Sequence, residues 1–266
     1  MIKVKKKRMK FNKTISVLIF LSTYFPSLQA QVNTESMRNA NLTDTLMHVI
    51  DLDIGLEKSN EEVFDGSLKY RLDYSPNDNY SAFIVLNYEN GYERLLNSSK
   101  NIITNKGFGH FRLTRKLNNT FFLEGFFQAG FNDFLLMKSR SLYGGGMRNN
   151  FFNKENAKIF LGLGVMQEIE NYNLESNDKK NLLRSTNYLS SNIVINDKTN
   201  WKNTIYFQVA SSDQRDYRLL YETGFEFSLS ESINFSFEFN FRYDNQPHGD
   251  LGKTYYNIKN GISFSF

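Results

Sequence analysis

The sequence contains no cysteine, and this absence removes several kinds of chemistry at once. Without thiols the chain has no disulfide, no thiolate metal site and no cysteine nucleophile. Proline, histidine and tryptophan are scarce, with three, three and one residues among 266. Past the N-terminus, no window approaches the run of about 20 apolar residues that a membrane-spanning helix needs. The sequence therefore excludes a disulfide-stabilised domain and a helical membrane protein.

Aromatic residues are abundant instead. The chain has 25 phenylalanines and 15 tyrosines, and aromatic residues make up 15% of it. Its mean hydropathy is nevertheless low, at −0.49. Both properties are expected together when apolar and polar residues alternate one by one, as they do in strands with two different faces.

The first 30 residues, 1–30, are predicted to be a secretory signal peptide. A basic segment, MIKVKKKRMKFNK, precedes the apolar segment TISVLIFLSTYF, and PSLQA offers Ala30 as the last residue before cleavage. A membrane anchor is the alternative, but the apolar segment is shorter than a spanning helix. Seven of the 32 basic residues lie here, which leaves 25 basic and 28 acidic residues in the mature chain. A mature chain with this weakly acidic balance is not expected to bind nucleic acid.

From about residue 47 the sequence alternates between apolar and polar residues. In the stretch SINFSFEFNFRYDN, every second residue from Ile233 to Tyr243 is large and apolar, and the residues between them are polar or charged. Such alternation is typical of half-buried strands. About twelve strands are counted in this way over residues 47–266. Residues 31–46 show no pattern and are expected to form a short periplasmic lead-in.

The connections between the predicted strands alternate between short and long. The short turns are 75–79, 116–119, 196–200 and 230–232, and the longer, more polar connections are 89–101, 170–180 and 244–253. Short turns at one end and long loops at the other are typical of an outer-membrane barrel. We therefore predict an all-β fold, an antiparallel transmembrane β-barrel of about twelve strands with its N- and C-termini in the periplasm.

The polar faces of the strands favour this barrel over a soluble β-sandwich or another β-rich periplasmic domain. They carry charges of both signs on neighbouring strands, which suit a wet lumen, while the aromatic faces suit lipid. The predicted lumen-facing charged residues are Asp51, Asp53, Lys69, Arg71, Arg112, Glu124, Arg148, Arg218, Glu222, Glu226, Glu238 and Arg242.

The last strand ends in the sequence GISFSF. Phe264 and Phe266 occupy alternate positions, and Phe266 is the final residue. A terminal aromatic residue on an alternating strand resembles the signal that the barrel assembly machinery reads. We predict that Phe264 and Phe266 form this signal. The expected partners are outer-membrane lipid and, during biogenesis, the secretion and assembly machineries, and the mature protein is expected to be a monomer in a Gram-negative outer membrane.

A resemblance to a known family is carried by the stretches RKLNNTFFLEGFFQAGFND, SRSLYGGGMRNNFF, FLGLGVMQE and DYRLLYETGFEFSLSESINFSFEFNFRYDNQP. Over roughly residues 47–266 the sequence resembles the salt-induced outer membrane proteins, a domain of unknown function numbered 481. The resemblance rests on strand patterns with glycines at fixed places. It implies an outer-membrane β-barrel without an established activity.

The sequence contains no convincing catalytic constellation. The three histidines are His48, His110 and His248. None is followed two positions later by the serine that barrel lipases place there. Asp51 and Asp53 lie about 7 Å apart on one strand face, a spacing that suits glycoside hydrolysis, but ion pairs with Lys69 and Arg71 across the first hairpin explain them better. We expect no enzyme, no cofactor and no metal.

Two classes of function remain open. The first is a narrow or plugged pore, or a structural envelope protein. A twelve-stranded bore is much smaller than that of porins with 16–18 strands, and lumen charges such as Glu222 and Arg242 would narrow it further by pairing. The second is a barrel enzyme or a surface-binding protein that acts through its extracellular loops.

Deletion of Phe266 tests the assembly signal. If the residue acts during delivery, the deletion lowers the outer-membrane yield in cells, whereas the purified chain still refolds into detergent as the parent does. Both yields are measured for parent and variant. A normal yield of the shortened chain in cells would contradict the role assigned to Phe266.

Overall fold

The computed structural model describes residues 45–59, 61–95, 98–174, 179–248 and 252–265. The predicted signal peptide, nearly all of the predicted lead-in and Phe266 lie outside these residues. The described part of the chain contains twelve strands and one short 3-10 helix. They are β1 (Leu46–Lys58), β2 (Glu61–Asn77), β3 (Tyr80–Leu95), β4 (Asn101–Lys116), β5 (Phe121–Asn132), η1 (Asp133–Leu135), β6 (Met137–Lys154), β7 (Ala157–Tyr172), β8 (Lys179–Asn196), β9 (Thr199–Ala210), β10 (Tyr217–Ser228), β11 (Ile233–Asp244) and β12 (Thr254–Ser265).

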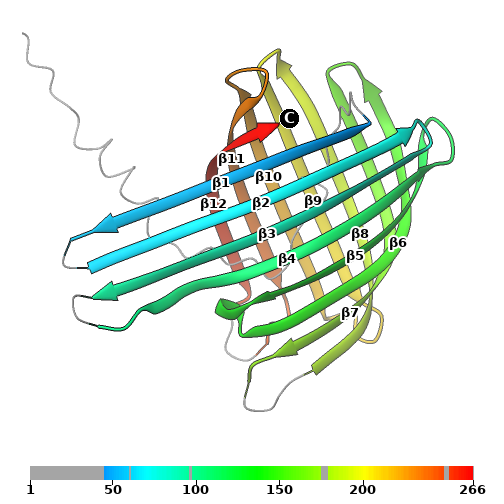
Figure 1. Ribbon diagram of the computed structural model, residues 1–266. Coiled ribbons are helices and arrows are strands. Elements are labelled where there is room, and N and C mark those ends of the chain that lie inside the picture. Colours follow the sequence, from blue (N-terminus) through cyan, green and yellow to red (C-terminus); the bar gives the residue numbers. More distant parts are fainter. Residues whose placement is uncertain (1–44, 60, 96–97, 175–178, 249–251, 266) are drawn as a thin grey trace, which may run out of the picture.

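The strands form a closed antiparallel barrel. Each strand pairs with its neighbours in the chain, and β1 pairs with β12 to complete the ring (Figure 1). This confirms the predicted fold class and strand count. Across the described residues, no helix has the length and apolar character needed to cross a membrane.

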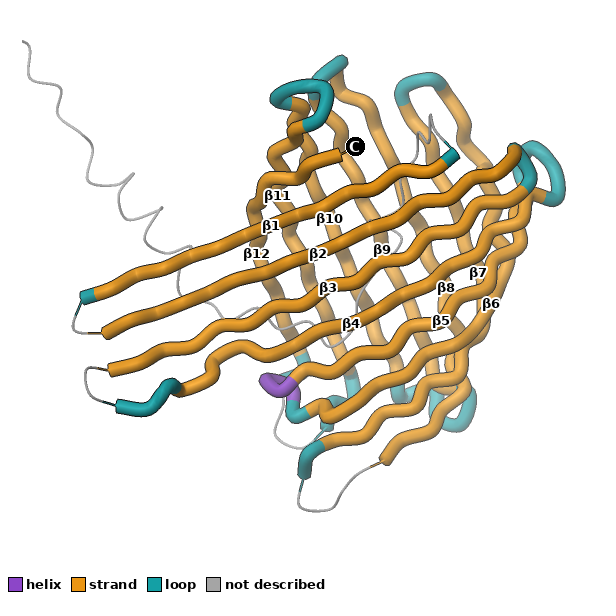
Figure 2. The backbone as a smooth tube through the Cα atoms, viewed as in Figure 1, coloured by secondary structure: helices purple, strands orange, loops and turns teal. Residues whose placement is uncertain are grey.

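The two ends of the barrel differ in their connections. At one end, here the turn end, connections of two to four residues join β2 to β3, β4 to β5, β6 to β7, β8 to β9 and β10 to β11. β1 begins and β12 ends at this same end. The other end, here the loop end, carries most of the longer connections (Figure 2). The placement of the turn end in the periplasm stays a prediction.

Asparagines shape two of the turns. The side-chain oxygen of Asn77 accepts hydrogen bonds from the backbone N–H groups of Asn79 and Tyr80, at 2.9 and 3.1 Å. Asn118 accepts in the same way from Thr120 and Phe121, both at 2.9 Å. Asparagine side chains can satisfy backbone donors within a turn, and this allows strands to reverse over a few residues.

Alternation along each strand separates an apolar outer face from a polar inner face. Outer residues such as Leu86, Phe127 and Val165 are about half exposed. The residues between them, such as Glu124 and Gln128, are buried inside the barrel. An outward apolar surface around a polar interior is the arrangement of a membrane barrel and the reverse of a soluble one.

The interior also contains apolar side chains that the charge pattern does not indicate. Tyr188, Tyr206 and Leu220 form a buried cluster inside the barrel. The ring of Tyr188 packs directly on Gly162, where an added Cβ would lie 2.0 Å from a ring carbon. The bore of a small barrel is narrow enough for side chains to fill, so the glycine leaves the space that the tyrosine ring occupies.

The facing of β11 can be tested with two adjacent substitutions. Phe237 is on the outer face, whereas Glu238 lines the lumen. Phe237→Arg should cost about 2–4 kcal/mol of unfolding free energy, because it places a charge near the bilayer midplane. Glu238→Gln should cost clearly less, because this side chain faces water. Equilibrium unfolding in lipid compares the two, and equal losses would contradict the assigned faces.

Candidate functional site

The lumen is the candidate site. Eleven of the twelve charged residues named from the sequence line hollows of the lumen or belong to ion pairs inside it, and Asp53 lies on the same strand face as Asp51. Asp53 is exposed, because the second half of β1 stays paired with β2 but runs away from β12. From the turn end to the loop end, the lumen passes through a vestibule, a central pocket and a belt of ion pairs.

The vestibule occupies the turn end. It consists of two hollows of about 1550 and 1660 Å³, volumes that include space open to solvent, and Lys202 lines both of them. The first hollow is rich in asparagine and serine side chains, and the second carries Asp51, Glu222, Glu226 and Glu238. This half of the lumen is wide, polar and accessible to water.

Two ion pairs in the vestibule are partly exposed, and a third is buried. Lys202 lies 2.8 Å from Glu226, and Lys69 lies 3.2 Å from Asp51, as expected across the first hairpin. Arg71 differs from the expectation: it pairs at 2.5 Å with Asp73 on its own strand rather than with an aspartate of β1. Residues two apart on a strand share a face, so Arg71 has a partner without crossing to β1.

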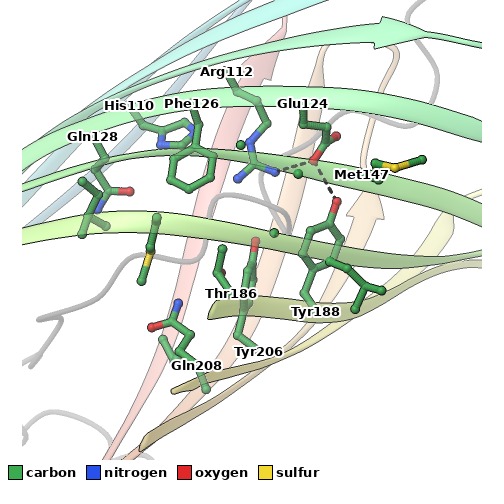
Figure 3. Close-up of a pocket in the computed structure, with 17 residues that line it drawn as sticks. His110, Arg112, Glu124, Phe126, Gln128, Met147, Thr186, Tyr188, Tyr206 and Gln208 are labelled. Carbon is green, nitrogen blue, oxygen red and sulfur yellow. Dashed lines mark hydrogen bonds and ion pairs between the residues drawn. The ribbon is translucent and has the colours of Figure 1, made fainter. Parts of the chain in front are cut away.

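A central pocket of about 590 Å³, again including open space, follows the vestibule (Figure 3). Arg112 lies 3.1 Å from Glu124, and the hydroxyl of Tyr188 donates to the same carboxylate at 2.9 Å. These contacts draw side chains of β4, β5 and β8 across the bore and narrow it.

The belt of ion pairs lies at the loop end of the lumen, on its β6–β11 side. Its members come from β6, β7, β8, β10, β11 and the connection before β10, and they are Arg140, Glu168, Glu170, Arg184, Asp216, Arg218, Arg242 and Asp244. Four are basic and four are acidic, so the belt is formally neutral. Seven have side chains that are at most 6% exposed, and Arg242 is 15% exposed.

Glu168 is the centre of the belt. Its carboxylate contacts Arg140, Arg184 at 2.5 Å and Arg218 at 2.8 Å. A carboxylate that is fully removed from water needs such partners, because an unpaired buried charge costs several kcal/mol. Three guanidinium groups from β6, β8 and β10 therefore converge on one residue of β7.

Arg218 extends this network to β11. Besides Glu168, it contacts Glu170 at 3.3 Å and Asp244 at 2.9 Å. Asp244 also pairs with Arg242 at 2.6 Å. The sequence analysis suggested Glu222 as the partner of Arg242, but Glu222 lines the vestibule, nearer to the turn end. The belt thus joins five strands through shared carboxylates.

A loop covers part of the belt from outside. His248, in the connection between β11 and β12, stacks on Tyr172 with ring centroids 3.7 Å apart. Its Nε2 atom lies 3.6 Å from a carboxylate oxygen of Glu170. The same connection is attached to its neighbour, because the side chain of Gln246 donates to Asp213 at 3.2 Å.

The lumen charges predicted from the sequence include Arg218 and Arg242 of the belt but not Glu168 or Glu170. A polar connection was expected over residues 170–180, whereas β7 continues to Tyr172. Glu168 and Glu170 alternate with Ile169, so the period of two was the available signal. It was hidden because charged residues at the end of a strand resemble the start of a polar loop.

Of the two residues assigned to the assembly signal, Phe264 is described and Phe266 is not. Phe264 lies on the outer face of β12 and is 43% exposed. It pairs with Ile50 of β1 and with Ile233 of β11. It is thus part of the seam that closes the barrel, and its role as a signal remains a prediction.

Comparisons with known proteins add a family and a fold. The family described as "Protein of unknown function, DUF481" matches residues 56–266. Among curated proteins, none matches the sequence. An outer membrane channel from Pseudomonas putida F1 is 9% identical with a TM-score of 0.52, over 86% of this chain and 100% of that one. The translocator domain of autotransporter NalP from Neisseria meningitidis is 12% identical with a TM-score of 0.51, over 85% and 90%. At these identities the likeness concerns the fold.

Glu168→Gln tests the role of the belt in stability. The substitution removes the charge that three buried arginines share, and breaking a buried pair in this way costs about 3–5 kcal/mol. The matched control is Glu226→Gln, which removes one partner of a partly exposed pair in the vestibule. Equilibrium unfolding measures both variants. Equal and small losses would show that the belt is not a buried network.

Proposed function

The chain belongs to the DUF481 family, and we propose that it is an outer-membrane β-barrel whose pore is closed at its loop end. The observation that carries the proposal is the belt, in which eight charged side chains on the β6–β11 side of the lumen pair with and neutralise one another. In this proposal the protein is a monomer that faces lipid all around and opens a wide vestibule to the periplasm.

Support for the membrane location comes from the outer surface. Large apolar side chains are exposed on every strand of the ring, including Leu52 on β1 and Ile258 on β12. A water-soluble protein rarely exposes a continuous apolar surface of this extent. The short turns at one end and the fold shared with outer-membrane proteins point in the same direction.

Support for closure comes from the energetics of the belt. A solute or ion that passes along the barrel axis on the β6–β11 side must separate pairs such as Glu168 with Arg218 and Arg218 with Asp244. Each separation leaves a buried charge without its partner, at a cost of several kcal/mol. Pores conduct when their binding sites are weak enough for solutes to leave, and the belt lacks that property.

The proposal includes no catalytic activity. Within the described ranges, no three histidine, aspartate or glutamate side chains are grouped as a metal ion would require. The charged side chains of the belt are neutralised by neighbours rather than directed at an open cleft. The two similar structures are named as a channel and a translocator domain, which fits a barrel that works through its wall or its bore.

Planar-bilayer recording tests the closure. Protein extracted from the outer-membrane fraction, checked for slower gel migration after boiling, should show little or no ionic conductance. The double variant Glu170→Ser/Arg218→Ser removes one charge of each sign from the belt and should open a conducting path. The control Lys202→Ser/Glu226→Ser removes a neutral pair from the vestibule and should stay closed. Equal conductance in parent and belt variant would contradict the proposal, as would recovery of the protein in the soluble fraction.

A further inference from the structure

The junction between β1 and β12 is the shortest ladder in the described barrel. It consists of four residue pairs, from Val49 with Ser265 to Leu52 with Ile262. Every other junction in the described ring has eleven or more pairs. The barrel is therefore closed at this seam by a small part of the available strand length.

From the seam, the two strands diverge toward the loop end. Figures 1 and 2 show β1 to β4 running together away from β12. Residues 53–57 of β1 and 257–261 of β12, all within the described ranges, form no ladder pair with one another. A β-bulge at Gly91 and Tyr92 interrupts the pairing of β3 with β4 in this projecting part, and bulges bend the strands that contain them.

Unpaired strand edges are costly in this location. Ile258 lies on the outer face of β12 and is 56% exposed, within the apolar band that faces lipid in the proposed function. Backbone N–H and C=O groups that face hydrocarbon without a partner cost several kcal/mol each. The gap beside β12 is therefore stable only if water or polar groups fill it, or if β1 returns to pair with it.

The sequences of β1 and β12 are compatible with pairing beyond the four observed residue pairs. If the observed register continues past Leu52, Leu56 pairs with Ile258, and both are apolar and outward. Gly55 then lies opposite Lys259 on the inner face, where its missing side chain leaves room for the lysine. Asp53 and Glu57, one step to either side on the same face, become diagonal partners for the ammonium group.

In the open arrangement, Lys259 has a different partner. Its Nζ atom lies 2.7 Å from Glu89 of β3, and the other oxygen of Glu89 lies 2.9 Å from Lys106 of β4. This contact, here the strap, links β12 to β3 across the inner side of β1 and β2. Lys259 is 28% exposed and Glu89 is 6% exposed. The strap limits how far the gap opens into the lumen.

We infer that the β1–β12 seam is a lateral portal through which an amphipathic molecule, with an apolar body and a polar head, passes between the lumen and the lipid. The rim of the gap is apolar outside, at Leu56 and Ile258, and charged inside, at Lys259, which pairs with Glu89 of β3. The inference rests on the proposed closure of the loop end, because a lumen without an axial exit needs a lateral one.

Dye entry into cells tests the portal, with N-phenyl-1-naphthylamine as the probe because it fluoresces in apolar surroundings. Lys259→Met removes the strap and should raise entry severalfold over the parent. Lys202→Met is the matched control, because Lys202 is also 28% exposed and pairs at 2.8 Å with Glu226, and these two residues lie on β9 and β10, which do not form the seam. It should leave entry at the parental level.

An engineered disulfide provides the second part of the test, and the chain has no native cysteine that could form other cross-links. In the Lys259→Met background, oxidised Leu56→Cys/Ile258→Cys should cross-link within one chain and return dye entry to the parental level. Addition of a reductant should break the cross-link and raise dye entry again. Leu52→Cys/Ile262→Cys joins residues that are already paired and should cross-link without lowering entry.

Four results would overturn the portal. Two concern dye entry: unchanged entry in Lys259→Met, or entry that stays high after the cross-link has formed. Two concern the cross-link: none between Cys at positions 56 and 258 when positions 52 and 262 form one, or a cross-link between two chains, which would make the gap an interface between copies. Failure of the axial closure is seen separately, as ionic conductance of the parent barrel.

Discussion

The structure depends on one constraint, the pairing of every backbone N–H and C=O group that faces lipid. A single chain can meet it with strands only by closing them into a ring, and twelve antiparallel strands do so here. Ring closure then dictates the alternation of side chains, apolar toward the outside and polar toward the bore. The place where the constraint is least well met is the seam, where four pairs join β1 to β12. That weakness is the physical basis of the lateral portal.

The interior follows from the size of the ring. A small barrel cannot enclose charges at random, because side chains from opposite walls meet in the bore. At the turn end, ion pairs remain partly exposed and the lumen stays wet. At the loop end, Glu168 and Arg218 are buried, and each of them contacts several side chains of opposite charge. In the proposed function the two ends therefore differ: the turn end admits water and solutes, and the loop end blocks them.

The sequence predicted the ring well and the site only in part. Period-two alternation indicated about twelve strands and the faces of most of them, because that pattern is local. It did not identify the belt, since the partners of Glu168 are 28, 16 and 50 residues away in the chain, and only the register of five strands brings them together. The pairing of Arg242 with Asp244 rather than Glu222 has the same origin. The face on which a side chain lies follows from the local pattern, whereas its depth in the bore depends on the stagger between neighbouring strands. The short β1–β12 ladder has no sequence signal, because both strands alternate along their full length.

The belt and the seam are complementary in this account, because a lumen that is closed along its axis can exchange molecules only through a lateral opening. The most direct test is a crystal structure in a lipid phase at a resolution that shows ordered water. The account predicts water throughout the vestibule, ending at the ion pairs of Glu168 and Arg218, with no water column beyond them. A continuous file of water from the turn end through the belt to the loop end would contradict it.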